Sequence, residues 1–264
     1  MCRHLAYVGP PTTLSALVLE PPHGLLHQSY APADMRGGGT INADGFGVGW
    51  YPAPGSDAAR YRSASPIWSD IAFPDVARTT CTTGALAAVR AATEGMPVVA
   101  TAAAPFGEGR WLFSHNGVVR GWPDAVAPLA AELPVSDLLR LDAPTDAALL
   151  WAMVRHRLRD RHDPGVVLAG VVAAVAAASP GSRLNLLLTD GRTVWATAWD
   201  HALSVRSTAD RALVASEPLD GDPGWKSVPD RHLVVARPGA HCTQPLAHDG
   251  GELLGTAPLN TTGS

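Results

Sequence analysis

Apolar residues follow two different periods along this chain, and strand-like and helix-like segments occupy different regions. Short apolar runs bounded by Gly and Pro predict early strands at residues 3–8, 46–51, 84–91 and 110–114. Thr12 or Thr13 would cap a short helix that ends at Leu19. The run Phe46–Tyr51 places glycine on one face of its strand, which permits close approach of another backbone or of a ligand.

Helical spacing dominates the middle of the chain. After Thr145-Asp146, apolar residues recur at helical spacing up to Leu158, with arginines mostly on the other side. Pro164-Gly165 should end this helix. A second helix is predicted over 166–178, and it is apolar nearly all round. We therefore expect it inside the molecule, against the first helix.

Strand-like runs return after these two helices. Runs 184–189 and 193–199 flank Asp190-Gly191, which predicts a hairpin. Further runs, expected to continue a meander, are 203–206, 212–216 and 233–236. This order of strands, helices and again strands predicts an α+β fold in which helices pack on antiparallel sheets. The chain lacks the βαβ alternation that a Rossmann or TIM-barrel fold requires. We expect one domain over 2–255 and a small, polar, disordered tail over 256–264.

Composition narrows the classes of function. The 264 residues are 46% hydrophobic and carry a net charge of −4, so a nucleic-acid or membrane partner is not expected. Three widely spaced cysteines form no disulfide framework, and no signal peptide begins the chain, so we expect a reduced, cytoplasmic protein. Ten histidines show no metal-ligand spacing, so no metal is expected.

Cys2 is the first candidate for chemistry because of its position. A small residue at position two normally permits removal of Met1, which would leave a free α-amine beside the Cys2 thiol. An α-amine titrates at about 7.7–8.0 and a thiol near about 8.5, so the amine could act as base for its own nucleophile. The alternative is a small early residue without a role.

Three further features have both a functional and a structural interpretation. Asn116-Gly117 offers two neighbouring donors for an oxyanion hole, or a common turn. Arg90 lies in an apolar strand, where it could hold a substrate carboxylate or form a structural ion pair. Asp146 could hold a substrate ammonium, or favour a helix N-terminus.

The order of these features along the chain is more specific than any one of them. The stretches concerned are Cys2–Leu5, Arg36–Gly39, Asn42–Tyr51, Arg90, Phe113–Val119, Thr145-Asp146, Leu184–Gly191 and Ala215–Leu219. In this order they resemble the class II glutamine amidotransferases, which are N-terminal nucleophile hydrolases. The resemblance extends from Cys2 to about Arg237, and it implies a four-layer α/β/β/α sandwich of two antiparallel sheets.

Within that family, five of these stretches are most similar to the γ-glutamyl hercynylcysteine sulfoxide hydrolases of ergothioneine biosynthesis. They are Cys2–Leu5, Asn42–Tyr51, Phe113–Val119, Leu184–Gly191 and Ala215–Leu219. The resemblance implies a cofactor-free hydrolysis of a small-molecule γ-glutamyl amide. The roles it implies are Cys2 as nucleophile, Asn116 and Gly117 as oxyanion hole, Arg90 and Asp146 as ligands of the glutamyl carboxylate and ammonium, and Thr93 and His115 as further substrate contacts.

One departure from the family pattern bears on the substrate. The ammonia-producing synthetases usually carry a Trp and a His close to that arginine, whereas Ala91–Gly95 follows Arg90 here, so a substrate bulkier than glutamine is expected. An ammonia donor to a separate synthetase and an inactive binding module are the alternatives. The distal trimethylammonium would suit an aromatic cage, with candidates Trp50, Tyr51, Trp68, Trp111 and Trp122.

Overall fold

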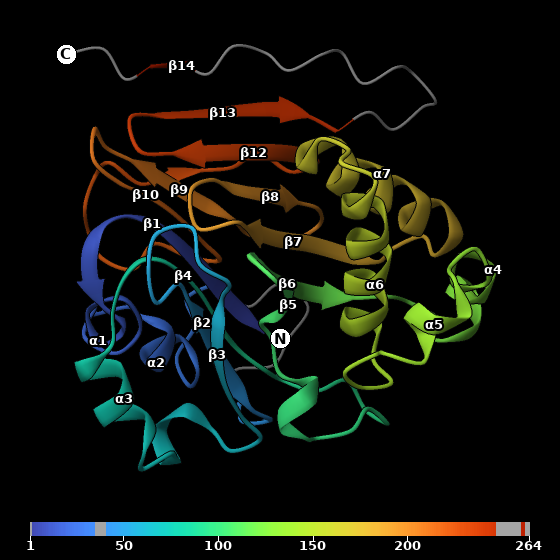
Figure 1. Cartoon of the computed structure of the whole chain (residues 1–264), viewed down its shortest axis with the longest axis horizontal. Helices are drawn as coiled ribbons and strands as arrows, with labels where there is room; N and C mark the ends of the chain where they lie inside the picture. Colours follow the sequence, from blue (N-terminus) through green and yellow to red (C-terminus); the bar gives the residue numbers. More distant parts are fainter. Residues whose placement is uncertain (1, 35–40, 247–259, 262–264) are drawn as a thin grey trace.

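The computed structural model describes residues 2–34, 41–246 and 260–261, which form two antiparallel sheets of seven strands each (Figure 1). The first sheet consists, in spatial order, of β11 (Lys226–Ser227), β9 (Ser204–Ser207), β10 (Ala212–Ala215), β1 (Arg3–Thr13), β4 (Cys81–Val89), β2 (Phe46–Trp50) and β3 (Ala59–Ser63). The second consists of β14 (Asn260–Thr261), β13 (Ala240–Pro245), β12 (His232–Arg237), β8 (Val194–Ala198), β7 (Arg183–Thr189), β6 (Trp111–Val118) and β5 (Phe106–Glu108).

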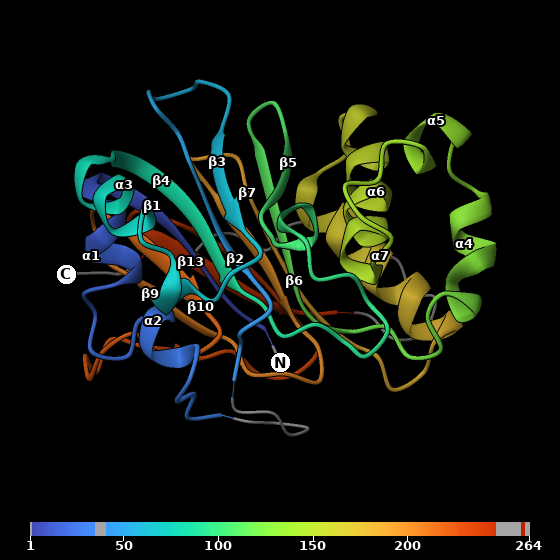
Figure 2. The same ribbon diagram turned by 90° about the horizontal axis from the view of Figure 1, so that it is seen from below.

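Helices cover the outer face of each sheet, so the layers run α/β/β/α as the resemblance implied (Figure 2). On the first sheet these are α1 (Leu14–Val18), α2 (Leu25–Gln28) and α3 (Phe73–Thr79). On the second they are α6 (Asp146–Arg159) and α7 (Pro164–Ala178). The remaining short elements are α4 (Ala127–Ala131), α5 (Val135–Leu138) and the 3-10 turns η1 (Ile67–Ser69), η2 (Ala100–Ala102) and η3 (Asp124–Val126).

The apolar core has three parts because each sheet is buried on both faces. Alternate side chains of a strand point to opposite faces, so on β1 Leu5 and Tyr7 pack against the helices while Ala6 and Val8 pack against the second sheet. This explains why the strand is apolar at successive positions instead of alternating. The resulting rigid layer carries the residue that precedes β1, Cys2.

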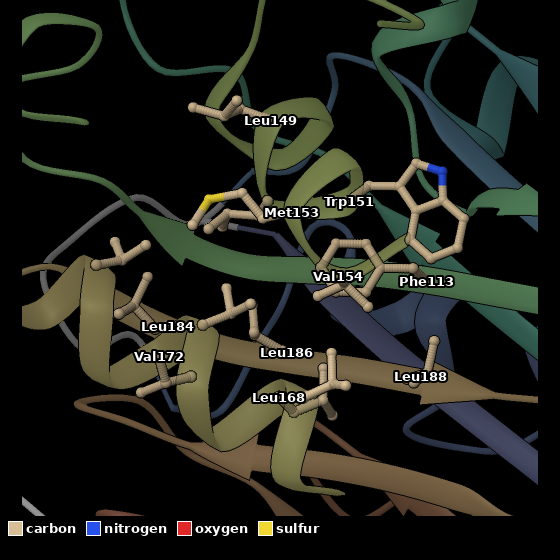
Figure 3. Close-up of a cluster of buried hydrophobic side chains, with 14 of the residues drawn as sticks. Phe113, Leu149, Trp151, Met153, Val154, Leu168, Val172, Leu184, Leu186 and Leu188 are labelled. Atoms are coloured by element: carbon tan, nitrogen blue, oxygen red, sulfur yellow. The ribbon is translucent and has the colours of Figure 1, made fainter. Parts of the chain in front are cut away.

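An apolar cluster lies between the second sheet and the two long helices α6 and α7, and it packs these helices against the strands (Figure 3). Its labelled members are Leu149, Trp151, Met153 and Val154 of α6, Leu168 and Val172 of α7, Phe113 of β6, and Leu184, Leu186 and Leu188 of β7. Each fully buried Leu or Val contributes about 1.5–3 kcal/mol relative to an exposed one. The first residue of α6, Asp146, is thereby held close to the end of β6.

The predicted helix starts are confirmed. The side chain of Thr13 accepts from the Ala16 N–H to cap α1, and the side chain of Thr145 accepts from the Ala148 N–H to cap α6. The interior placement of the second long helix is wrong. The helix begins earlier, at Pro164, and it lies in the outer layer with Val166 46% exposed. Its outward residues are otherwise mostly small, which explains how an apolar sequence can face solvent.

The hairpin at Asp190-Gly191 is confirmed, and the Asp190 carboxylate accepts two backbone N–H bonds in the turn. The single meander after it is wrong, because the chain changes sheets. Strands β9 and β10 join the first sheet, and β12 returns to pair with β8 in the second. The first strand also continues beyond its expected end to Thr13, with an irregular register between Val8 and Thr12 that accommodates the prolines.

Two sequence predictions fall largely on residues outside the described ranges. The glycine-rich stretch Arg36–Thr40 lies there entirely. Of the tail expected to be disordered, 256–264, the described residues are Asn260 and Thr261, which pair with β13. Across the described part of the chain, no helix is long and apolar enough to cross a membrane.

Candidate active site

The ends of four chain segments meet beside Cys2. Arg3 pairs with Val89, the last residue of β4, so Cys2 lies next to the chain that leaves this strand. The Cys2 Sγ lies 3.7 Å from the Ala91 carbonyl oxygen. The glycine face of β2 lets the loop before β5 approach closely, because a Cβ at Gly47 would lie 2.4 Å from the Ala104 carbonyl oxygen. The close approach expected for that face is therefore made by protein backbone.

One cavity gathers six of the seven candidate residues. It is lined by Cys2, Arg90, Thr93, His115, Gly117 and Asp146. These residues come from the N-terminus, the β4 exit, β6 and the start of α6, so only the folded chain brings them together. Sequence reasoning missed the apolar wall, which includes Met96, Ala102, Ala104 and Phe106. These residues lie singly in loops and short elements, so no periodic pattern in the sequence could have revealed them.

Arg90 is 8% exposed and has no ion-pair partner among the described residues. Its Nη1 donates to the carbonyl oxygens of Pro97, at 2.9 Å, and Asp44, at 3.5 Å. Neutral carbonyl groups orient the guanidinium but do not neutralise its positive charge. A buried charge that is not neutralised costs free energy. The geometry therefore favours the interpretation of Arg90 as an anion ligand over the structural ion pair.

Asp146 is anchored at the cavity wall by backbone donors. Its Oδ1 accepts from the Ala147 N–H at 2.7 Å, and its Oδ2 accepts from the Val119 N–H at 3.0 Å. His115 Nδ1 lies 4.0 Å from the same Oδ2, while His115 Nε2 is 3.0 Å from the Arg183 carbonyl oxygen and donates to it. Asp146 thus occupies a helix N-terminus and also presents a fixed negative charge to the cavity.

The neighbours Asn116 and Gly117 face different surroundings because side chains alternate along β6. Gly117 lines the cavity, and a Cβ there would lie 1.9 Å from the Arg183 carbonyl oxygen, so only glycine fits. Asn116 is fully buried and donates from Nδ2 to Ser216 Oγ at 3.0 Å. Its side chain is the one candidate that does not line the cavity.

A buried charge network that sequence reasoning missed lies behind the nucleophile. Arg3 donates from Nη1 to the Cys2 carbonyl oxygen at 3.0 Å and from Nε to Glu217 Oε1 at 2.7 Å. The His23 ring lies 2.6 Å from Glu217 Oε2. Burial raises the pKa of Glu217, but the His23 hydrogen bond, backbone donors and the Arg3 charge outweigh it and hold that pKa below its usual value.

His4 lies between the sheets, directly after this network. Its side chain is fully buried, with Nδ1 3.2 Å from Ser114 Oγ. Burial, reinforced by the charges of His201, His115 and Arg3, lowers the pKa of His4 from 6.5 to about 3. The ring is therefore neutral at physiological pH, so His4 adds no positive charge near Cys2.

Of the five aromatic candidates for a cage, Trp122 lies in a groove next to the cavity around Cys2. It lines a groove of about 400 Å³ that shares Thr93 and Met96 with that cavity. Neither space is lined by the other four, Trp50, Tyr51, Trp68 and Trp111. Tyr51 and Trp111 instead have structural contacts, the first through hydrogen bonds to two carbonyls and the second against Trp195.

Comparison with known proteins identifies the family of this chain. The sequence model of the class II glutamine amidotransferases matches residues 13–209. This chain belongs to the class II glutamine amidotransferase family. It is 42% identical over 247 residues to a γ-glutamyl-hercynylcysteine sulfoxide hydrolase from Mycolicibacterium smegmatis, covering 93% of this chain and 100% of the relative. A protein of the same name from Mycobacterium tuberculosis is 43% identical over 89% of this chain and 92% of its own length.

Solved structures share the fold at low sequence identity. A glutamine aminotransferase class-II domain protein from Silicibacter pomeroyi superposes with a TM-score of 0.67 at 23% identity, covering 93% of this chain and all of that chain. Glutamine phosphoribosylpyrophosphate amidotransferase from B. subtilis gives a TM-score of 0.61 at 12% identity, covering 94% of this chain and 50% of that chain. At these identities the likeness concerns the sandwich fold.

Proposed function

We propose that this chain hydrolyses the γ-glutamyl amide bond of γ-glutamyl hercynylcysteine sulfoxide, releasing glutamate and hercynylcysteine sulfoxide. The observation that carries the proposal is one cavity that is faced by a thiol, an anchored carboxylate and a guanidinium without an ion pair among the described residues. A glutamyl group carries the complementary pair, an α-carboxylate and an α-ammonium. The names of the relatives at 42–43% identity support the same substrate.

In the proposed binding mode, Arg90 holds the glutamyl carboxylate and Asp146 holds the ammonium. The planar guanidinium suits a carboxylate because it can donate two parallel hydrogen bonds. His115 and Thr93 line the same space and complete the polar contacts. The substrate's γ-carbonyl would then lie at Cys2, beside Gly117.

The reaction proceeds through a thioester in two steps. With Met1 removed, the α-amine of Cys2 takes the thiol proton, and the sulfur adds to the γ-carbonyl carbon. The Gly117 N–H stabilises the oxyanion, a contribution of about 3 kcal/mol for one donor. The Asn116 amide donates to Ser216 in this structure, so it would supply a second donor only after turning towards the cavity. The C–N bond then breaks as the leaving nitrogen takes the proton from the amine of Cys2. Water adds to the thioester, glutamate leaves, and the thiol is restored.

Glutamate release from the conjugate tests this proposal. Cys2→Ala should abolish turnover while leaving the unfolding transition unchanged, because the side chain is small and lies outside the apolar clusters. The matched control is Cys81→Ala, which removes an exposed thiol remote from the cavity and should keep full activity. Turnover by Cys2→Ala, or Met1 retained on active protein in a mass spectrum, would contradict the scheme.

The leaving group needs its own comparison, because the family also includes enzymes that release ammonia from glutamine. We expect a higher kcat/KM for the hercynylcysteine sulfoxide conjugate than for glutamine, since Ala91 and Ala92 leave room beside Arg90. A kcat/KM that favours glutamine would replace the proposal with that of an ammonia donor.

A further inference from the structure

The groove beside the cavity is placed to receive whatever leaves the γ-carbonyl. Its walls are formed by residues 93–96, 118–123 and 144. The second wall continues directly from Gly117, which lines the cavity, and Thr93 and Met96 border both spaces. A substrate whose glutamyl end fills the cavity therefore extends naturally into this groove. The volume of about 400 Å³ is within the usual range for small-molecule sites.

The groove offers charges of both signs that are not used elsewhere. Glu94 and Arg120 are exposed, and within the described ranges neither side chain has an ion pair or hydrogen bond. The Arg120 backbone is fixed, because its N–H donates to Ser182 Oγ and its carbonyl accepts from Ser179 Oγ.

Trp122 adds an aromatic surface at the same place. It is partly buried, and it packs on the cluster that also holds α6. An aromatic face beside a carboxylate is the arrangement that recognises a quaternary ammonium, which cannot donate a hydrogen bond. Glu94 supplies the carboxylate, since it lines the same groove as Trp122.

A second pocket, of about 520 Å³ beside Glu217, is less suitable for the leaving group. It shares no lining residue with the cavity around Cys2. Its aromatic residue, Trp225, is already covered by the Arg206 guanidinium, 5.6 Å from the ring centroid. Its Asp220 is paired with the same arginine.

We propose that the groove of residues 93–96, 118–123 and 144 binds the leaving half of the substrate as a zwitterion. Trp122 and Glu94 contact the trimethylammonium group, and Arg120 contacts a carboxylate of hercynylcysteine sulfoxide. This inference rests on the proposed function, and it identifies the residues that would distinguish this substrate from glutamine.

Two conjugates separate recognition of the ammonium from recognition of the carboxylates. The first is γ-glutamyl hercynylcysteine sulfoxide, and the second is its analogue with hydrogen in place of the trimethylammonium group. Trp122→Ala and Glu94→Gln should each lower kcat/KM for the first conjugate by about tenfold, while changing it for the analogue by less than about threefold. Arg120→Met should lower kcat/KM for both conjugates by about tenfold, because both keep their carboxylates.

Matched controls are Trp68→Ala and Arg78→Met, whose exposed side chains lie outside the cavity and the groove. Both should keep the kcat/KM of the wild type. Glu94→Gln changes an exposed residue and so keeps the test valid if Trp122→Ala fails to fold. Equal losses on the two conjugates for Trp122→Ala and Glu94→Gln, or no loss on either conjugate for all three groove variants, would overturn the groove proposal alone. A wild-type protein that releases no glutamate from the first conjugate would overturn the proposed function and the groove with it.

Discussion

Replacing Glu217 by Gln removes one negative charge from the network behind Cys2. Each carboxylate oxygen accepts two hydrogen bonds, Oε1 from Arg3 Nε and the Asp34 N–H, and Oε2 from His23 Nε2 and the Ala33 N–H. An amide NH₂ in either position would face two donors instead of accepting from them. The side chains of Arg3 and Glu217 are 1% and 4% exposed, so water cannot compensate for the loss.

The expected cost is that of breaking a buried ion pair. Removing one partner leaves a buried charge without compensation, which lowers the free energy of unfolding by about 3–5 kcal/mol. A matched control is Asp220→Asn, which breaks the Arg206–Asp220 pair at 3.2 Å, with side chains 16% and 38% exposed. Such a pair near the surface contributes about 0–1 kcal/mol.

Urea unfolding of both variants measures these two costs. Because the folded-state pKa of Glu217 lies below its ordinary 4.5, its contribution is present above pH 4.5 and is lost as the pH falls through the folded-state value. The difference between wild type and Glu217→Gln should therefore shrink in acid. We also expect a lower kcat, because Arg3 holds the Cys2 carbonyl. A loss no larger than that of Asp220→Asn, or one independent of pH, would refute the reasoning.

Three further predictions concern the same region. The His4 pKa falls from 6.5 to about 3 on folding, so the unfolded state binds the extra proton and the free energy of unfolding should decrease as the pH falls below 6.5. The decrease should reach about 2 kcal/mol by pH 5 in denaturant titrations, and a His4→Gln variant with an equal slope would contradict it. Gly117→Ala should lower the unfolding free energy by about 1–3 kcal/mol and abolish turnover, because its Cβ meets the Arg183 carbonyl at 1.9 Å. Gly170→Ala lies in a helix, and apart from its chain neighbours and the local helix backbone no atom is within 4 Å of the new Cβ. This variant should instead raise the unfolding free energy by about 0.5–1 kcal/mol, and equal thermal shifts for the two variants would refute the contrast. Arg90→Lys should raise KM for the γ-glutamyl conjugate by about tenfold in steady-state kinetics, because Lys keeps the charge but loses the planar fork, and an unchanged KM would remove Arg90 from carboxylate binding.

Local sequence determines most of the elements and those ends that a side-chain cap or a tight turn fixes. Caps at Thr13 and Thr145 and the turn at Asp190-Gly191 were predictable, because each depends on a side chain bonding to backbone within three residues. The α+β class and the candidate residues also followed from the chain alone. Their assigned roles in catalysis remain predictions, to be decided by the kinetic experiments above.

Tertiary structure decided which faces and which distant residues meet. Period and hydrophobicity indicate that a strand is buried, but they do not identify its neighbours, so β9 and β10 were not separable from β8 until their pairing was seen. The apolar composition of α7 led to the wrong prediction that this helix is interior. Its outward residues are mostly small, so they can face water although by composition alone they look like core residues.

The site shows the same division. The sequence by itself determined that a thiol, an arginine and an aspartate were available, at positions 2, 90 and 146. Only folding placed them around one cavity and paired Arg3 with Glu217 across 214 positions of sequence. The physical reason is that buried charges select partners by distance in space, for which separation along the chain carries no signal.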